Sequence, residues 1–260
     1  MNAKYLIRND LSDLVPQYPS NFILKKLAFT LAEVLITLAI IGVVAAMTMP
    51  TLIQHFQKKS LETQTQRFYS MMSQAVKQYM ADYGVDDLRN TPLAYDNYEY
   101  EGSPEAIASI RDFVTKYLKV VKECDHDAND CFASEYQVWN GSKPDGENFT
   151  NFTTRANWDR RRDYVLADGS VIRIGYNGPI ALYVDVNGKK GPNRVGYDLW
   201  YMDIFWDGVI DEYGVTPEFR SGEEKIENWT PREYNFESCK VGAYSGCFGH
   251  FLENNFKFDY

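Results

Sequence analysis

The sequence predicts an α+β fold in which one long N-terminal α-helix packs on an antiparallel β-sheet of about four strands. Two patterns lead to this prediction. Apolar residues form a continuous run near the N-terminus and then recur at helical spacing to about residue 81. From Asp163 onward the hydrophobic pattern alternates with a period of two. With 260 residues, 45% of them hydrophobic, the chain is long enough to bury a core beneath such a sheet.

The apolar run near the N-terminus extends from Ala28 to Met49, about 22 residues. At about 1.5 Å per residue, a helix of this length crosses a hydrocarbon core of roughly 30 Å. Lys25 and Lys26 precede the run, so the positive-inside rule keeps the N-terminal end in the cytoplasm and sends the rest of the chain outward. Glu33 interrupts the run, and a carboxylate inside a membrane segment generally marks function.

The helix is expected to continue beyond Pro50 to about Ala81. Pro50 removes one backbone hydrogen bond and is expected to kink the helix. Asp82-Tyr83-Gly84 is expected to end it, because glycine suits the position after a helix C-terminus. The apolar residues at helical spacing after Pro50 are Leu52, Phe56, Leu61, Phe68, Met72, Ala75, Tyr79 and Met80.

A second helix is expected over residues 104 to 122, because Ser103 and Pro104 form a typical helix start. The four cysteines form two close pairs, and neither has CxxC spacing. They are Cys124 with Cys131 and Cys239 with Cys247. This pattern favours disulfides in an oxidising compartment.

The alternating pattern defines the strands of the predicted sheet. Turns are expected at Asp168-Gly169 and Asn177-Gly178. The strands themselves are expected at Tyr164 to Leu166, Val171 to Tyr176, Ile180 to Asp185 and Tyr197 to Phe205. Residues 140 to 160 are rich in Asn, Gly, Ser, Asp and Thr and are expected to form a loop.

The segment KKLAFTLAEVLITLAIIGVVAAMTMPTL, residues 25 to 52, resembles the cleavage and methylation segment of type IV prepilins and type II secretion pseudopilins. The resemblance implies that a prepilin peptidase cuts between Ala28 and Phe29 and methylates the new amine of Phe29. It also implies that Glu33 pairs with the N-terminal amine of a neighbouring subunit. Pro50 stands where pilins commonly carry a proline. Ala28 replaces the usual glycine before the cut and keeps its small size.

The same resemblance implies a pilin-like architecture. It divides the chain into a leader at 1–28, a transmembrane and assembly half of the helix at 29–50, an amphipathic half at 51–82 and a globular head at 83–260. The implied partners are the peptidase, other pilin or pseudopilin subunits and an inner-membrane assembly platform. The implied location is the inner membrane, and afterwards a periplasmic or cell-surface filament. Two other interpretations stay open: a signal peptide cut after Ala46 and an uncleaved membrane anchor.

The loop from Val184 to Asp198 resembles the DxNG…PN…G…D loop of pilin-like heads, and in pseudopilins a loop near this region binds calcium. Asp185, Asn187 and Asp198 offer the oxygen ligands that calcium prefers. Lys189 and Lys190 oppose a cation there. A turn closed by Asx hydrogen bonds and glycine is the favoured interpretation, with calcium as the alternative.

The remaining patterns argue against nucleic-acid binding and catalysis. The formal net charge of −9 repels phosphate backbones, so generic nucleic-acid binding is not expected. With three histidines and no HExxH, GxSxG, Walker A or GxGxxG motif, the chain is predicted not to be an enzyme. Asp207, Asp211 and Glu212 are expected to be solvated loop charges. The acidic residues and His126 between the first two cysteines are expected to form a polar disulfide loop rather than a metal site.

Together these patterns predict a structural subunit, a minor pilin or pseudopilin, of a type IV pilus or type II secretion-like filament. The alternative is a monomeric membrane-anchored or secreted protein whose acidic head binds a ligand or calcium.

Overall fold

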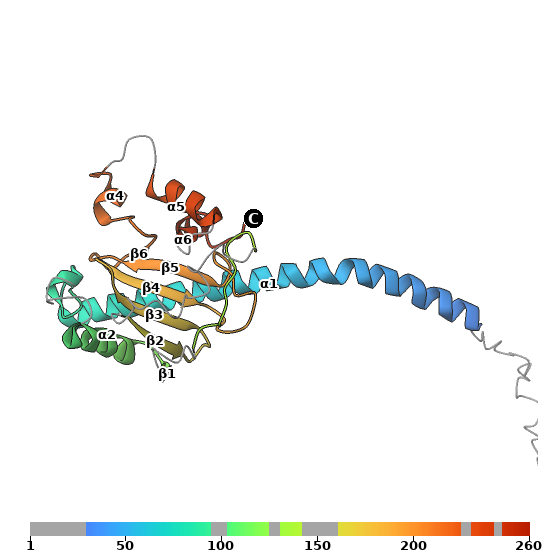
Figure 1. The fold of residues 1–260 in the computed structure, drawn as a ribbon, viewed down its shortest axis with the longest axis horizontal. Helices are drawn as coiled ribbons and strands as arrows, with labels where there is room; N and C mark the ends of the chain where they lie inside the picture. The colour runs from blue at the N-terminus through green and yellow to red at the C-terminus, as the bar shows by residue number, and fades with distance from the viewer. Residues whose placement is uncertain (1–29, 95–102, 125–130, 142–160, 225–229, 242–245) are drawn as a thin grey trace, which may run out of the picture. The chain divides into compact units, whose positions relative to one another are not determined.

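The computed structural model describes residues 30–94, 103–124, 131–141, 161–224, 230–241 and 246–260 (Figure 1). The chain divides into two units, residues 1–51 and 52–260, which are described separately. The elements in chain order are α1 (Leu31–Tyr83), the 3₁₀ helix η1 (Leu88–Asn90), α2 (Pro104–Tyr117), β1 (Val120–Glu123), β2 (Arg161–Leu166), β3 (Val171–Tyr176), β4 (Ile180–Asp185), β5 (Leu199–Ile204), β6 (Ile210–Asp211), α4 (Pro217–Ser221), α5 (Pro231–Lys240) and α6 (Cys247–Glu253).

Helix α1 confirms the predicted long N-terminal helix. It ends at Tyr83, and Gly84 follows in the left-handed conformation with φ of 65°. Leu52 and Phe56 were expected on its packing face, yet their side chains are 54% and 63% exposed. The buried stripe consists of Leu61, Phe68, Met72, Ala75, Val76, Tyr79 and Met80. The packing face therefore begins at Leu61, about two turns later than the sequence pattern suggests.

The sheet is an antiparallel meander with the strand order β1-β2-β3-β4-β5-β6. The four predicted strands are present, and the short strands β1 and β6 extend the sheet at its two edges. β1 falls where the second helix was expected to continue, so that helix prediction is wrong at its C-terminal end. α2 stops at Tyr117, and Val120 pairs with Leu166 of β2. The β-branched Val120 and Val121 suit an edge strand better than another helical turn.

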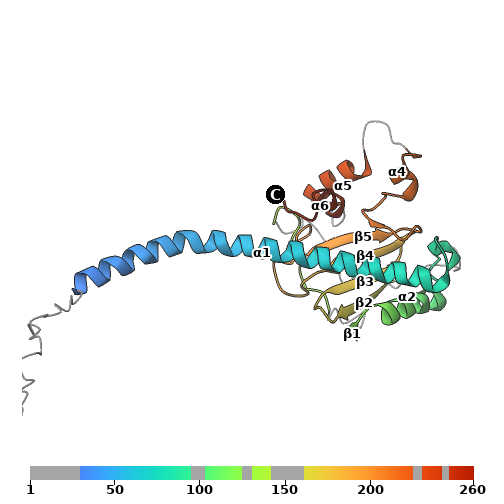
Figure 2. The same ribbon diagram turned by 180° about the vertical axis from the view of Figure 1, so that it is seen from behind.

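The face of the sheet toward α1 is apolar. Trp200 of β5 faces α1, because its indole N–H donates to Thr65 Oγ1 at 3.1 Å. Strand register places Val184 and Ile172 on the same face as Trp200. The C-terminal half of α1 crosses this face, as the two opposite views show (Figures 1 and 2). The buried stripe of α1 and these side chains form one hydrophobic core.

The opposite face of the sheet is polar and yet buried. Asp163 of β2 and Arg173 of β3 stand opposite each other and form a bidentate ion pair at 2.7 and 2.6 Å. The Arg173 guanidinium also lies 5.1 Å from the ring centroid of Phe132. Tyr183 and Tyr201 pack edge to face with ring centroids 4.6 Å apart. Each of the strands β3, β4 and β5 has six residues, and all of them are buried. The sheet therefore differs from an antiparallel sheet that has one face in solvent.

The C-terminal helices complete the core beside α1. Phe251 of α6 packs on Trp200 with centroids 4.6 Å apart, and Phe248 lies 5.9 Å from Tyr69 of α1. Gly246 is the N-cap of α6 with φ of 100°, and a Cβ there would lie 2.0 Å from the Asn235 carbonyl oxygen of α5. Only glycine fits this junction, because any side chain would collide with α5.

Candidate functional site

Among the described residues of its unit, the first half of α1 is an apolar surface that packs on no other element. α1 is long and apolar enough to cross a membrane, judged by its length and composition. Its large hydrophobic side chains are exposed from Leu31 to Ile53. Contiguous exposed apolar surface of this size indicates a membrane or a protein partner. Glu33 is the only Asp, Glu, Lys or Arg residue in the sequence between Leu31 and Gln57.

Glu33 has a defined place at the start of α1. Its Oε2 accepts the Thr30 backbone N–H at 2.8 Å and the Thr30 hydroxyl at 2.9 Å. The Glu33 N–H donates in return to Thr30 Oγ1 at 3.2 Å. This reciprocal pair is a capping box, which satisfies backbone donors that the first turn of a helix leaves unpaired. The carboxylate is thereby held beside the N-terminal end of the helix, where the helix dipole favours negative charge.

The other three predicted residues of the processing and assembly segment have different outcomes. Ala28 and Phe29 lie outside the described residues, so cleavage between them stays a prediction. Pro50 lies inside α1, and the helix continues through it. The proline lacks the N–H that would bond to the Ala46 carbonyl, so this turn carries one hydrogen bond fewer than its neighbours.

Asp185 and Asp198 bracket the predicted loop between β4 and β5. Asp185 Oδ2 accepts the Tyr136 hydroxyl at 2.6 Å, and Oδ1 accepts the Asn187 N–H at 3.2 Å. The two oxygens of Asp198 accept consecutive backbone N–H groups of the loop at 2.7 and 2.6 Å. Asn187 donates from Nδ2 to the Gly191 carbonyl at 3.1 Å, and its buried Oδ1 has no hydrogen-bond partner in the described part of the chain.

Both carboxyl groups are fully buried, and this changes their acidity. Burial raises the pKa of Asp185 well above its usual range, and the neighbouring Asp198 charge adds to the shift. Burial also raises the pKa of Asp198, to about 6, against the effect of its backbone hydrogen bonds.

The N–H and O–H groups that donate to Asp185 and Asp198 support a turn closed by Asx hydrogen bonds more than they support a calcium site. All four carboxylate oxygens already accept an N–H or O–H group that closes the turn, so a bound cation would have to share oxygens that the turn uses. Among the described residues no group of three or more His, Cys, Asp or Glu side chains is arranged to hold a metal ion.

We expect millimolar calcium to leave the Tm of the protein unchanged, because every carboxylate oxygen at this loop already closes the turn by accepting a hydrogen bond. Differential scanning calorimetry with calcium, with magnesium and with a chelator measures this. A rise of several degrees with calcium alone, abolished in Asp198→Asn, would instead establish the calcium site.

Asp211 and Glu212 are buried, so the prediction that they are solvated loop charges is wrong. Glu212 Oε1 accepts the Gly246 N–H at 3.1 Å, and Oε2 accepts the Gly249 N–H at 2.7 Å, at the start of α6. Asp211 pairs with Arg232 at 2.7 Å. The two carboxylates thus connect β6 to α5 and α6. The sequence carried no signal for this, because the donors lie far along the chain.

The two predicted cysteine pairs are both joined. Cys124 and Cys131 form one disulfide with Cα atoms 6.1 Å apart, and Cys239 and Cys247 form the other at 5.5 Å. The second bridge links the end of α5 to the start of α6, beside the Glu212 contacts. The acidic residues and His126 between the first pair lie outside the described residues.

Comparison with known proteins gives two matches on the chain. Residues 24–49 match the prokaryotic N-terminal methylation motif, which covers the end of the predicted leader and the apolar start of α1. Residues 51–201, more than half of the chain, match a family of unknown function, DUF6613. No curated protein and no solved structure matches. The chain therefore belongs to the DUF6613 family, and its methylation motif followed by a long apolar helix makes it a type IV prepilin-like protein.

Proposed function

We propose that the mature protein is a structural subunit, a minor pilin or pseudopilin, of a type IV pilus or type II secretion-like filament. The observation that carries this proposal is the placement of Glu33. It is the only carboxylate in the exposed apolar half of α1, and Thr30 holds it at the first turn of that helix. A buried carboxylate in hydrocarbon requires a positive partner, and the amine of a neighbouring subunit supplies one.

In this proposal the first half of α1 serves two purposes. Before assembly it anchors the protein in the inner membrane, with Lys25 and Lys26 on the cytoplasmic side and the head outside. After cleavage by the prepilin peptidase, the same surface packs against other subunits delivered by the assembly platform. The protein catalyses no reaction, and its final location is a periplasmic or cell-surface filament.

Mass spectrometry of the N-terminus tests the processing step. We expect the mature chain, isolated from cells that contain a prepilin peptidase, to begin at N-methylated Phe29. In a strain without the peptidase the leader should remain attached. A mature chain that begins at Met47 would instead indicate a signal peptide, and one that begins at Met1 would indicate an uncleaved anchor. Either result would overturn the proposal.

The second candidate function is a monomeric membrane-anchored or secreted protein whose head binds a ligand or calcium. The acidic composition of the head favours it. Cross-linking in membranes separates the two functions, because a filament subunit gives ladders of cross-linked chains and a monomeric binding protein does not.

A further inference from the structure

The junction of α1 and α2 contains a cavity of about 330 Å³ that none of the functions above uses. Its lining residues come from the C-terminal end of α1, from α2 and from the segment between them. The two helices lie side by side in both views (Figures 1 and 2). Three tyrosine rings and several polar groups line it. The residues that matter for its chemistry are Tyr79, Tyr83, Tyr117, Asp112, Thr115 and Lys116.

The tyrosine rings are held in fixed positions. Tyr79 is buried, and its ring centroid lies 4.7 Å from Tyr83 and 5.4 Å from Tyr117. The Tyr117 hydroxyl donates to Asp82 Oδ2 at 2.7 Å, which fixes the third ring. Tyr83 is 48% exposed and presents ring surface to a ligand. A preformed aromatic wall of this kind costs little conformational entropy on binding.

The charges around the cavity select against ionic ligands. Lys116 Nζ lies 3.3 Å from Asp82 Oδ2 and 4.9 Å from the Tyr117 ring centroid, so a cationic ligand meets a positive charge already in place. Asp82 and the exposed Asp112 repel a phosphate or carboxylate. The Asp112 carboxylate has no hydrogen-bond or ion-pair partner in the described part of the chain and remains available as an acceptor. Thr115 donates to the Arg111 carbonyl at 2.8 Å and retains acceptor capacity.

We propose that this cavity binds one neutral pyranose ring of a glycan. The face of a pyranose carries C–H groups with partial positive charge, and these pack on the negative face of an aromatic ring such as Tyr83. The sugar hydroxyls then donate to Asp112 and Thr115 and accept from Lys116. The volume lies at the lower end of the range of about 300–1,000 Å³ for small-ligand sites, which suits one sugar ring rather than a long oligosaccharide.

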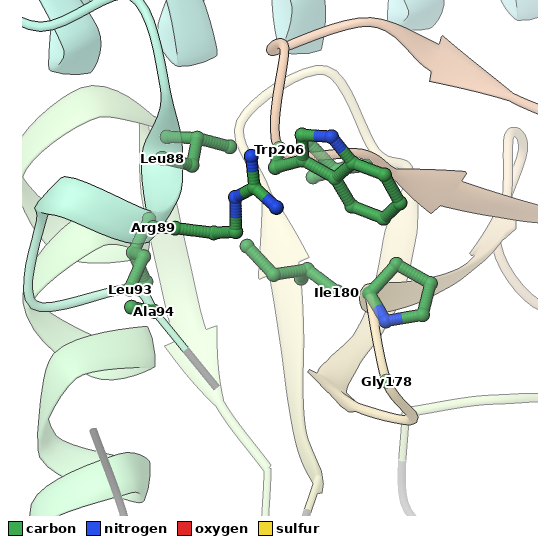
Figure 3. Close-up of a pocket in the computed structure, with 9 residues that line it drawn as sticks. Leu88, Arg89, Leu93, Ala94, Gly178, Ile180 and Trp206 are labelled. Atoms are coloured by element: carbon green, nitrogen blue, oxygen red, sulfur yellow. The ribbon is translucent and has the colours of Figure 1, made fainter. Parts of the chain in front are cut away.

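A neighbouring cavity provides an internal comparison. It has a volume of about 240 Å³ and is lined mainly by apolar groups, including Leu88, Ile180 and Trp206 (Figure 3). The Arg89 guanidinium lies 5.1 Å from the Trp206 ring centroid and is paired with Asp87 at 2.6 Å. This ring is therefore partly covered, and few polar groups surround it. Trp206 is an aromatic residue at which the proposal expects no sugar contact.

Saturation-transfer NMR on the full-length protein tests the proposal. The protein is held in nanodiscs, because sugar-based detergents would compete, and the probes are the methyl glycosides of glucose, galactose, mannose and N-acetylglucosamine. At least one glycoside is expected to receive saturation. Tyr83→Ala should weaken its binding at least about tenfold, since the stacking surface is removed. Asp112→Asn, an exposed substitution, should weaken binding while leaving the fold intact.

Two matched variants make the result specific. Tyr213→Ala removes another half-exposed tyrosine outside the cavity and should bind as the wild type does. Trp206→Ala should also retain binding. The proposal is overturned if none of the four glycosides receives saturation, if Tyr83→Ala and Asp112→Asn both bind as the wild type does, or if binding is lost in Trp206→Ala but kept in Tyr83→Ala. Thermal melting of each variant separates lost binding from lost folding.

Discussion

Glu33→Val is expected to leave membrane insertion intact and to reduce incorporation into a filament at least about tenfold. Removing the carboxylate makes the apolar segment easier to insert, because a charged side chain within a membrane segment opposes insertion. It also removes the partner that the proposal assigns to the amine of the next subunit. A tenfold loss corresponds to about 1.4 kcal/mol, which is modest for breaking a charge pair out of water.

The measurement compares the membrane fraction with cross-linked or sheared filaments, for wild type and variant side by side. Thr37→Val is the matched control. It removes a polar side chain of the same segment whose hydroxyl bonds only to the Val34 carbonyl of its own helix, at 2.9 Å. This control should assemble normally. If Glu33→Val assembled as well as the control, the pairing of Glu33 between subunits would be refuted.

A variant of Thr30 tests how the position of the Glu33 carboxylate affects assembly. Thr30→Val removes the hydroxyl that Glu33 accepts at 2.9 Å but keeps the backbone N–H at 2.8 Å. The carboxylate then keeps its charge and loses one of the contacts that position it. An assembly defect smaller than that of Glu33→Val is therefore expected.

Glu212→Ala is expected to destabilise the head by about 3 kcal/mol or more at pH 5. The side chain is fully buried, and its removal leaves the N–H groups of Gly246 and Gly249 without an acceptor. Each buried unsatisfied donor costs about 1–3 kcal/mol, and the empty space left by the shortened side chain adds to this cost. Urea unfolding followed by circular dichroism gives the free energy of unfolding. The exposed Glu223→Ala is the control and should change it by less than about 0.5 kcal/mol.

The same residue is expected to make stability depend on pH. Burial raises the pKa of Glu212 from its usual 4.5 to about 7, against three backbone hydrogen bonds that lower it. The folded protein therefore holds this proton more tightly than the unfolded chain does. Its contribution to stability is complete below about pH 4.5 and is lost as the pH rises through 7. The loss amounts to about 3 kcal/mol, because one pKa unit corresponds to 1.36 kcal/mol.

Glu212→Gln tests the direction of this dependence, because the amide resembles the protonated acid and does not titrate. Wild type should lose stability between pH 5 and pH 8, and the variant should lose about 3 kcal/mol less. Buried Asp203, whose pKa burial also raises to about 7, should keep part of the slope in both proteins. The opposite result would be a wild type that gains stability toward pH 8 while the stability of Glu212→Gln does not change with pH. It would show that the backbone donors lower the pKa of Glu212 by more than burial raises it.

Several features of the fold followed from local pattern alone. The long helix and its stop at Gly84 were predictable because periodicity and a glycine C-cap are short-range properties of the chain. β3 and β4 matched their predicted bounds, since Asn177-Gly178 is a local turn signal. β1 was missed because pairing with Leu166, and not helix propensity, decides the structure at Val120.

What the sequence determined by itself is the apolar N-terminal helix with one carboxylate, because the length, composition and charge of one continuous segment decide membrane affinity. Only the tertiary structure decided how α5 and α6 complete the core and that Glu212 is buried. The reason is distance along the chain. The donors to Glu212 come from residues 34 and 37 positions later, and short polar helices such as α5 show no apolar periodicity of their own.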